Sequence, residues 1–126
     1  PLDWYARRFV ELNVNYFIFN PLPIPRPSRS NKLWQRVVNL SGRLSCPDER
    51  FSEWAKSVGV EYGSLDDTEK LDKIHELDAV SAHLYGLSEK QLTHIFETFR
   101  EGWDGQPRLN EVMKHYNSWK KELIND

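Results

Sequence analysis

The residues that point most directly to a binding function are four basic side chains between residues 26 and 36. They are Arg26, Arg29, Lys32 and Arg36, with Ser28, Ser30 and Asn31 among them. Arginine, lysine, serine and asparagine side chains, together with helix N-termini, are the groups that hold phosphate oxygens. The segment therefore predicts a phosphate-binding surface, and the competing interpretation is a solvated linker.

The distribution of charge supports this prediction better than the net charge of −2 does. The first 50 residues hold eight Lys and Arg against four acids, a net of +4. The remaining 76 residues hold nine Lys and Arg against fifteen acids, a net of −6. Halves of opposite sign can place one face on a polyanion and the other in solvent or against a partner, although ordinary scatter of surface charge gives the same counts.

The histidines and the cysteine do not form the patterns of a catalytic or metal site. The four histidines fall on expected helices with no pair at i, i+3 or i+4, which favours partly exposed helix positions over a metal site. His83 and His94 lie on neighbouring helices and are the two that could still meet. Cys46 is the sole cysteine, so an intrachain disulfide or thiolate cluster is excluded and a packed, structural role is expected. We predict no catalytic, cofactor-binding or metal-binding residue in this chain.

Acidic side chains cluster between residues 66 and 78, and such a run usually marks a solvated helix face. The members are Asp66, Asp67, Glu69, Asp72, Glu76 and Asp78. Asp78 is the predicted exception, because it stands beside the apolar positions Leu77 and Val80. We expect it to cap or pair inside the fold instead of reaching water.

The first 30 residues predict an extended arm after a short helix over residues 3–10. Residues 13–19 are nearly all apolar or β-prone and predict a strand or extended segment. Residues 20–30 carry proline at four alternate positions, which fixes φ, removes N–H donors and favours a polyproline-II strap. Leu22 and Ile24 can anchor that strap, and the apolar stretch 13–24 can support self-association.

The residues that follow the arm predict about five helices. Asn31 is the expected N-cap of a helix that reaches Leu44. Ser45 or Cys46, followed by Pro47, is expected to start the next helix. That helix would bury Phe51, Trp54, Ala55 and Val58. A helix from Asp66 to Gly86 would bury Leu71, Ile74, Leu77, Val80 and Leu84. The last helix is expected over Leu109–Ile124, after a loop at 100–108. We therefore predict a mainly α fold: a small helical bundle at 31–126, preceded by an extended or β arm and polyproline strap at 1–30.

The sharpest local signal is the corner between residues 84 and 99. Gly86 is an expected helix end, and Ser88 with Gln91 has the spacing of a capping box. Leu87 and Leu92 occupy the two positions of a hydrophobic staple. Tyr85 and Phe99 are expected in the core, so the pattern specifies a helix–turn–helix corner without requiring a ligand.

This corner resembles a segment near the C-terminus of adenine-N6 DNA methyltransferases of the fused type IIG restriction–modification kind. That family has the form D-A-x-V-A-x-x-Y-G-L-[ST]-x-x-x-L-x-x-I-x-x-[ST]-F. The matching residues are Asp78, Ala79, Ala82, Tyr85, Gly86, Leu87, Ser88, Leu92, Ile95, Thr98 and Phe99. Ser81 departs from the form, which has Val there.

Two upstream stretches extend the resemblance over most of residues 12–99. Asn15-Tyr16-Phe17 running into Pro21-Leu22-Pro23-Ile24-Pro25 is similar to the exit strand and strap that close the family's target-recognition region. Leu33 to Cys46 is similar to the helix that follows there. The resemblance implies that residues 1–30 end the recognition region and that the chain is a C-terminal piece of a longer enzyme, as its start at Pro1 also suggests.

The resemblance implies a parent enzyme that uses S-adenosylmethionine and flips an adenine out of double-stranded DNA. The family's glycine-rich cofactor motif and its catalytic Asn/Asp-Pro-Pro-Tyr/Phe motif are not in this sequence; Asn20-Pro21-Leu22 lacks the second proline and the aromatic residue. The chain is therefore expected to be a cytoplasmic, non-catalytic accessory domain without a membrane span, supporting DNA recognition or bracing the upstream methyltransferase and recognition domains. The alternative is a purely structural or protein-interaction domain without DNA contact.

Overall fold

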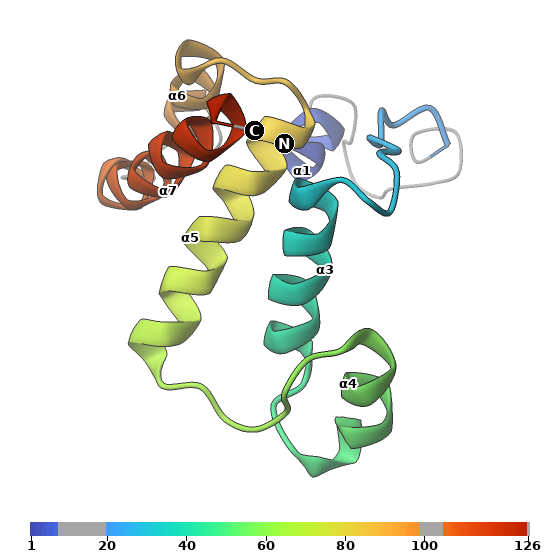
Figure 1. Cartoon of the computed structure of the whole chain (residues 1–126). Helices are drawn as coiled ribbons and strands as arrows, with labels where there is room; N and C mark the ends of the chain where they lie inside the picture. Colours follow the sequence, from blue (N-terminus) through green and yellow to red (C-terminus); the bar gives the residue numbers. More distant parts are fainter. Residues whose placement is uncertain (8–19, 99–104, 126) are drawn as a thin grey trace.

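The computed structural model describes residues 1–7, 20–98 and 105–125, and these form six α-helices and one short 3₁₀ turn (Figure 1). The elements are α1 (Leu2–Ala6), α3 (Lys32–Ser45), η1 (Glu49–Phe51), α4 (Ser52–Val58), α5 (Asp67–Leu84), α6 (Glu89–Thr98) and α7 (Gln106–Ile124). The predicted mainly helical fold is confirmed. Residues 22–28 lie in neither helix nor strand, and the strand predicted over 13–19 lies outside the described residues.

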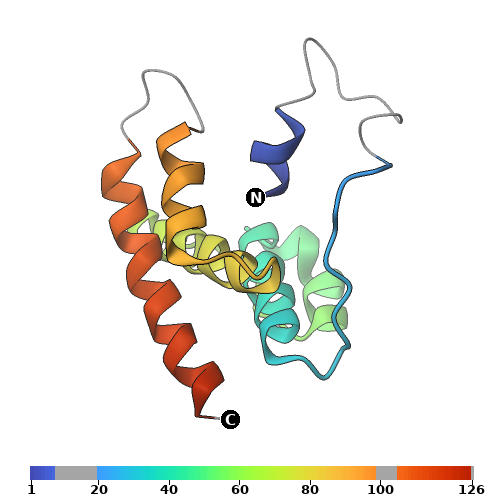
Figure 2. The same ribbon diagram turned by 90° about the horizontal axis from the view of Figure 1, so that it is seen from above.

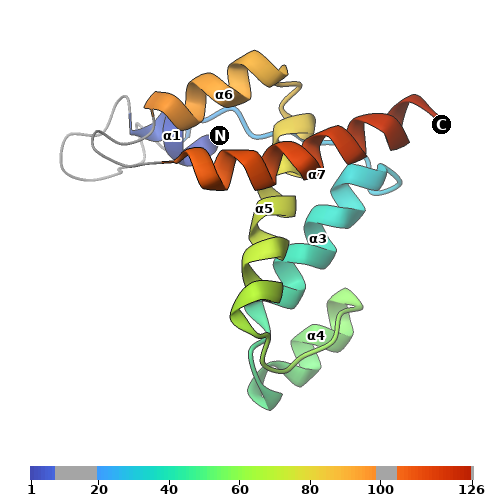
Figure 3. The same ribbon diagram turned by 90° about the vertical axis from the view of Figure 1, so that its left-hand side faces the viewer.

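The helices form two packed pairs that share α5. Helices α3 and α5 lie side by side, and α4 lies at the end of this pair where α3 ends and α5 begins (Figure 1). Helix α7 crosses the other end of α5, and α6 runs along α7 (Figures 2 and 3). No helix among residues 1–7, 20–98 and 105–125 has the length and apolar character needed to cross a lipid bilayer.

The helix starts follow the predicted capping residues. The Asn31 side chain accepts from the Trp34 N–H at 3.1 Å, and the Asp66 side chain accepts from the Glu69 N–H at 2.8 Å. At the start of α6, the Ser88 N–H donates to Gln91 Oε1 at 2.8 Å, and the Gln91 N–H donates back to Ser88 Oγ at 3.4 Å. This reciprocal pair is the capping box that the sequence predicts, and it satisfies donors that a helix start leaves unpaired.

Helix α5 ends in a Schellman turn at Gly86, whose φ of 65° lies in the left-handed region. The Gly86 N–H donates to the His83 carbonyl at 2.9 Å, and the Leu87 N–H donates to the Ala82 carbonyl at 3.0 Å. Leu87 and Leu92 then both join the core, as the staple predicts. The family-like corner is therefore accounted for by capping and packing.

We expect Gly86→Ala to lower the free energy of unfolding by about 1–2 kcal/mol, the usual cost of a β-carbon in the left-handed region. Open space surrounds the position, so backbone strain is the whole effect. Gly86→Asn is the matched control, because asparagine tolerates this conformation, and it should cost less. Urea denaturation of both variants measures the difference, and equal costs would contradict this account of the turn.

Two hydrophobic clusters hold the helices together. The first lies between α5, α6 and α7, where the small side chains of Ala79 and Ala82 let α7 approach closely. Its buried members are Ala79, Ala82, Leu92, Leu109, Val112 and Tyr116. The second joins α3 to α5 through Leu33, Leu40 and Val80. Because α5 contributes to both clusters, it is the central element of the fold.

The region after α3 differs from the prediction. Neither Ser45 nor Cys46 is the N-cap of a helix: α3 extends through Ser45 with Cys46 as its C-cap, and Asp48 caps η1 by accepting from the Arg50 N–H at 3.0 Å. The predicted burial of Phe51 and Trp54 is wrong, since both are exposed, while Ala55 is buried as expected. Helix α4 packs on α3 through the face that carries Ala55, so the rings of Trp54 and of the preceding Phe51 stay exposed to solvent.

Two further expectations about helix faces and ends are corrected. Leu71 was predicted in the apolar stripe of α5 but is 53% exposed, because α3 and α5 diverge toward the start of α5 (Figure 1). Helix α7 starts at Gln106, three residues before the predicted Leu109, and Pro107 fits its first turn since no N–H is needed there. Tyr85 is half-buried, and Phe99 lies outside the described residues.

Candidate nucleic-acid interface

The end of the strap is fixed to the first turn of α3 by hydrogen bonds. The Asn31 N–H donates to the Ser28 carbonyl at 3.0 Å, while the Asn31 side chain caps α3. The Gln35 side-chain amide donates to the Arg29 carbonyl at 3.1 Å. The backbone of residues 28–31 therefore has a defined position relative to the positive end of the α3 dipole.

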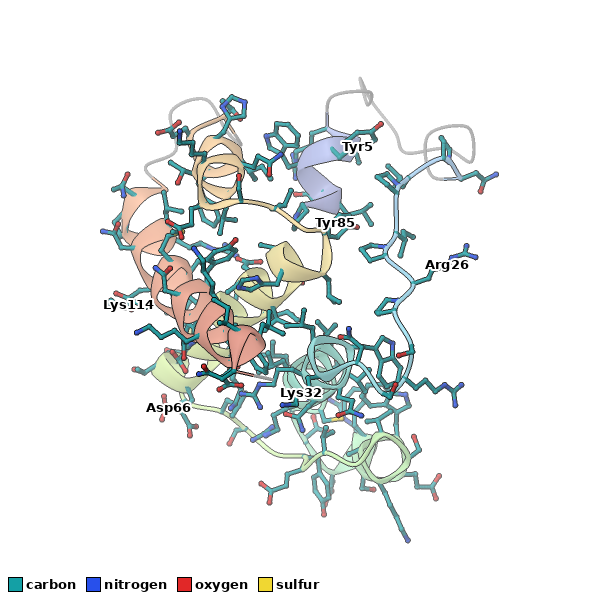
Figure 4. The ribbon with its side chains drawn as sticks, turned by 45° about the horizontal axis from the view of Figure 1, so that its top comes forward. Tyr5, Arg26, Lys32, Asp66, Tyr85 and Lys114 are labelled. Atoms are coloured by element: carbon teal, nitrogen blue, oxygen red, sulfur yellow. The ribbon has the colours of Figure 1, made fainter. Side chains whose placement is uncertain are left out.

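Arg26, Arg29 and Lys32 are exposed along this segment. The Arg26 side chain points away from the body of the molecule (Figure 4). The sequence places no Asp or Glu between residues 20 and 47, so acidic neighbours along the chain do not offset these charges. Exposed cations beside a helix N-terminus are suited to several phosphate oxygens of a polyanion.

Arg36 was predicted with these three residues, but the structure places its guanidinium against Glu76 of α5. Nε donates to Oε1 at 2.7 Å and Nη2 donates to Oε2 at 2.5 Å, a bidentate pair. The Trp119 indole N–H from α7 donates to the same Oε1 at 3.0 Å. Arg36 therefore joins α3 to α5 and α7, one turn after the strap.

Glu76 was expected on the solvated acidic face, and that expectation is wrong, because the residue is only 9% exposed. Burial by itself would raise the pKa of Glu76, but hydrogen bonds from Arg36 and Trp119 outweigh it and hold the pKa below its usual 4.5. The hydrogen bond with Glu76 raises the pKa of Arg36. Both groups are thus charged at neutral pH, and together they form an ion pair in the interface between the helices.

The other acid singled out by the sequence, Asp78, pairs with Arg108 of α7 at 2.6 Å, which confirms the predicted pairing; its side chain is 32% exposed, so the expectation that it is shielded from water is wrong. His115 of α7 likewise contacts Asp72 of α5 at 2.8 Å. Burial and the nearby Arg108 lower the pKa of His75, which therefore favours its neutral form. These contacts tie α5 to α7 along their exposed side.

The remaining histidines and Cys46 have structural surroundings. His83 stacks on Tyr116 with ring centroids 4.0 Å apart, and its Nε2 lies 2.9 Å from the Tyr116 carbonyl. His94 lies instead edge-on to Trp4 of α1, whose indole N–H donates to Thr98 Oγ1 at 3.1 Å. Cys46 is fully buried, as predicted. Across the described ranges, no three His, Cys, Asp or Glu side chains are grouped to hold a metal ion.

Sequence patterns did not reveal Gln35, Glu76 and Trp119 as the residues that position this surface. Gln35 acts on a carbonyl six residues away across a turn, a spacing that no helix period marks. Glu76 and Trp119 are 43 residues apart and meet only when α7 crosses α5. The available sequence signal for a buried acid was an acid next to apolar positions, and Asp78 has such neighbours just as Glu76 does.

Comparisons with protein-family models, with curated proteins and with solved structures give no match to this chain.

Proposed function

We propose that this chain is a non-catalytic accessory domain of a site-specific adenine DNA methyltransferase from a restriction–modification system, and that it helps to seat double-stranded DNA. The observation that carries the proposal is the exposed, hydrogen-bond-anchored basic segment of Arg26, Arg29 and Lys32 at the start of α3. The resemblance of the Asp78–Phe99 corner and the strap to the type IIG enzymes supplies the class of parent.

The strap has a defined place in this proposal. It would follow the exit strand of the recognition region in an extended, polyproline-like conformation and carry the chain to α3. Phosphate contacts there would set the register of the recognition region on the duplex without reading the sequence. The recognition and methyltransferase domains upstream would then be the partners of this domain, in a cytoplasmic enzyme.

Arg36 has a different role from the other three cations. Its guanidinium would have to leave a buried carboxylate to reach a phosphate, and breaking such a pair is costly. We therefore assign phosphate contact to Arg26, Arg29 and Lys32, and assign to Arg36 the positioning of α3. This refines the set of four expected from spacing.

Methyl transfer is assigned to the parent enzyme. S-adenosylmethionine sites of this kind need a strand that runs into a glycine-rich turn and a helix, with the cofactor at the turn. The sequence lacks that glycine-rich motif, so the proposal places the cofactor on the parent enzyme. No residue of this chain is therefore assigned a step of methyl transfer.

The proposal predicts salt-sensitive duplex binding centred on the strap. Triple replacement of Arg26, Arg29 and Lys32 with alanine should weaken binding several-fold at low salt. It should also reduce the slope of log K against log salt by about 2.7, since each phosphate contact contributes about 0.9. Fluorescence anisotropy with a labelled duplex at several salt concentrations measures both quantities.

A matched control removes three exposed lysines from other helices: Lys70, Lys90 and Lys114. Because both variants lose three charges, a purely nonspecific charge effect would weaken binding equally. Unchanged binding and slope in the strap variant would refute the proposal and favour the alternative, a structural domain that contacts only protein. The exposed aromatic residues around α4 are the feature that supports that alternative.

A further inference from the structure

The end of the molecule opposite the strap combines negative charge with exposed aromatic rings. We define the tip as residues 48–66, which comprise η1, α4 and the connection to α5. It holds five acids against two bases, and one base, Arg50, is paired with Asp48 at 2.8 Å. Phe51, Trp54 and Tyr62 are each more than a third exposed. Such a surface repels nucleic acid and suits a cationic, apolar protein segment.

An open groove of about 610 Å³ lies on the tip. Its lining comprises Ser52, Glu53, Lys56, Val60, Glu61 and Tyr62. Val60 and Tyr62 supply apolar surface, and Glu53 and Glu61 supply two carboxylates. An aromatic ring beside carboxylates is suited to a proline-rich strand that carries arginine, because proline packs on aromatic faces and guanidinium pairs with carboxylate.

The strap of this same chain has the complementary chemistry. Residues 20–30 contain four prolines, the apolar Leu22 and Ile24, and the cations Arg26 and Arg29, with no acid. Ile24 is 52% exposed, so its apolar surface is available for a partner. A stiff proline-rich segment also loses little conformational entropy on docking.

The strap and the tip cannot meet within one molecule as it is folded. The strap joins the start of α3 and the tip joins its end, and a 14-residue helix spans about 21 Å. The bonds of Asn31 and Gln35 hold the last residues of the strap at the first turn of α3. Figure 1 shows the strap joining α3 at the end away from α4.

We propose that the tip groove binds the strap of a second copy of this chain. Arg26 and Arg29 would pair with Glu53 and Glu61, and the strap's prolines and Ile24 would pack on Val60 and Tyr62. If two copies exchange straps reciprocally, so that each strap lies in the groove of the other copy, the two contacts are related by a two-fold axis and the assembly closes as a dimer. The inference does not depend on DNA binding, and because Arg26 and Arg29 cannot pair with a phosphate and with a groove carboxylate at once, duplex DNA would compete with this docking.

Charge reversal of the two surfaces tests this docking. One variant carries Arg26→Glu and Arg29→Glu; the other carries Glu53→Lys and Glu61→Lys. All four side chains are exposed, so both variants are expected to fold. Light scattering over a concentration series at low salt should show a rising mass for the parent chain and a constant monomer mass for each variant by itself.

Mixing the two variants should restore association, because every strap then meets a groove of opposite charge. A mixture that stays monomeric, or a variant that associates by itself as the parent chain does, would overturn the proposal, as would a parent chain that is monomeric throughout. Tyr62→Ala should weaken association several-fold, whereas Ile124→Ala, an exposed apolar change on α7, should not. Because no DNA is present, these outcomes are separate from those of the duplex-binding test.

Discussion

Replacing Glu76 with alanine is expected to lower the free energy of unfolding by about 2–3 kcal/mol. The change removes the acceptor for both the Arg36 guanidinium and the Trp119 indole N–H. A fully buried pair would cost more, but the Arg36 side chain is 36% exposed and water can hydrate it after the change. Urea denaturation followed by far-UV circular dichroism measures the loss, with Glu97→Ala on the surface of α6 as the matched control.

A double-mutant cycle separates the ion pair from simple loss of packing. Arg36→Met should be at least as destabilising as Glu76→Ala, because it leaves a buried carboxylate without its cation. Combining Arg36→Met with Glu76→Ala should recover part of the loss, since no buried charge remains. Losses that simply add would show that the two side chains are not coupled, contrary to their bidentate geometry.

The Arg36–Glu76 ion pair also gives the stability of the fold a defined pH dependence. The folded state lowers the pKa of Glu76, so it binds fewer protons than the unfolded chain around that pKa. The stabilisation from Glu76 is thus present above the ordinary value of 4.5 and is lost as pH falls through the lowered folded pKa. Comparing Glu76→Gln with the parent chain at pH 7 and near pH 3 checks the sign, because the difference in stability should shrink in acid.

The second large effect is expected for Leu92→Ala, which should lower the free energy of unfolding by about 3 kcal/mol. Leu92 is 2% exposed and packs in the cluster between α5, α6 and α7, so truncation leaves a cavity lined by several helices. Since α6 contributes few other buried residues, its docking onto α7 depends strongly on this side chain. Thermal and urea unfolding measure the change.

Leu71→Ala is the control with the same chemistry. The sequence pattern placed Leu71 in the apolar stripe of its helix, whereas the structure leaves it more than half exposed. Its replacement should therefore cost less than about 1 kcal/mol. Equal losses for the two leucines would mean that the end of α5 is buried against something beyond the described helices.

Most of the local structure is predictable from spacing along the chain. Asn31, Asp66, Ser88 and Gly86 each start or end a helix through bonds to residues three to five positions away, and such bonds depend on spacing that the sequence displays. The mainly helical class and the burial of Cys46 followed from the same local patterns and composition. The basic character of residues 26–36 was also visible, because charge is read directly from residue types.

Which of those side chains are paired and which are exposed depends on how the helices pack against one another. Arg36 and Arg26 look alike in the sequence, yet one is paired with Glu76 and the other points away from the molecule. Trp54 and Leu92 both have the spacing of core residues, yet α4 packs too little surface to cover Trp54. The physical reason is that the helix period fixes only the face on which a residue lies. Burial and pairing depend on which other helix packs against that face. In the contacts of Glu76 with Arg36 and Trp119, the partners are about 40 positions apart in the sequence.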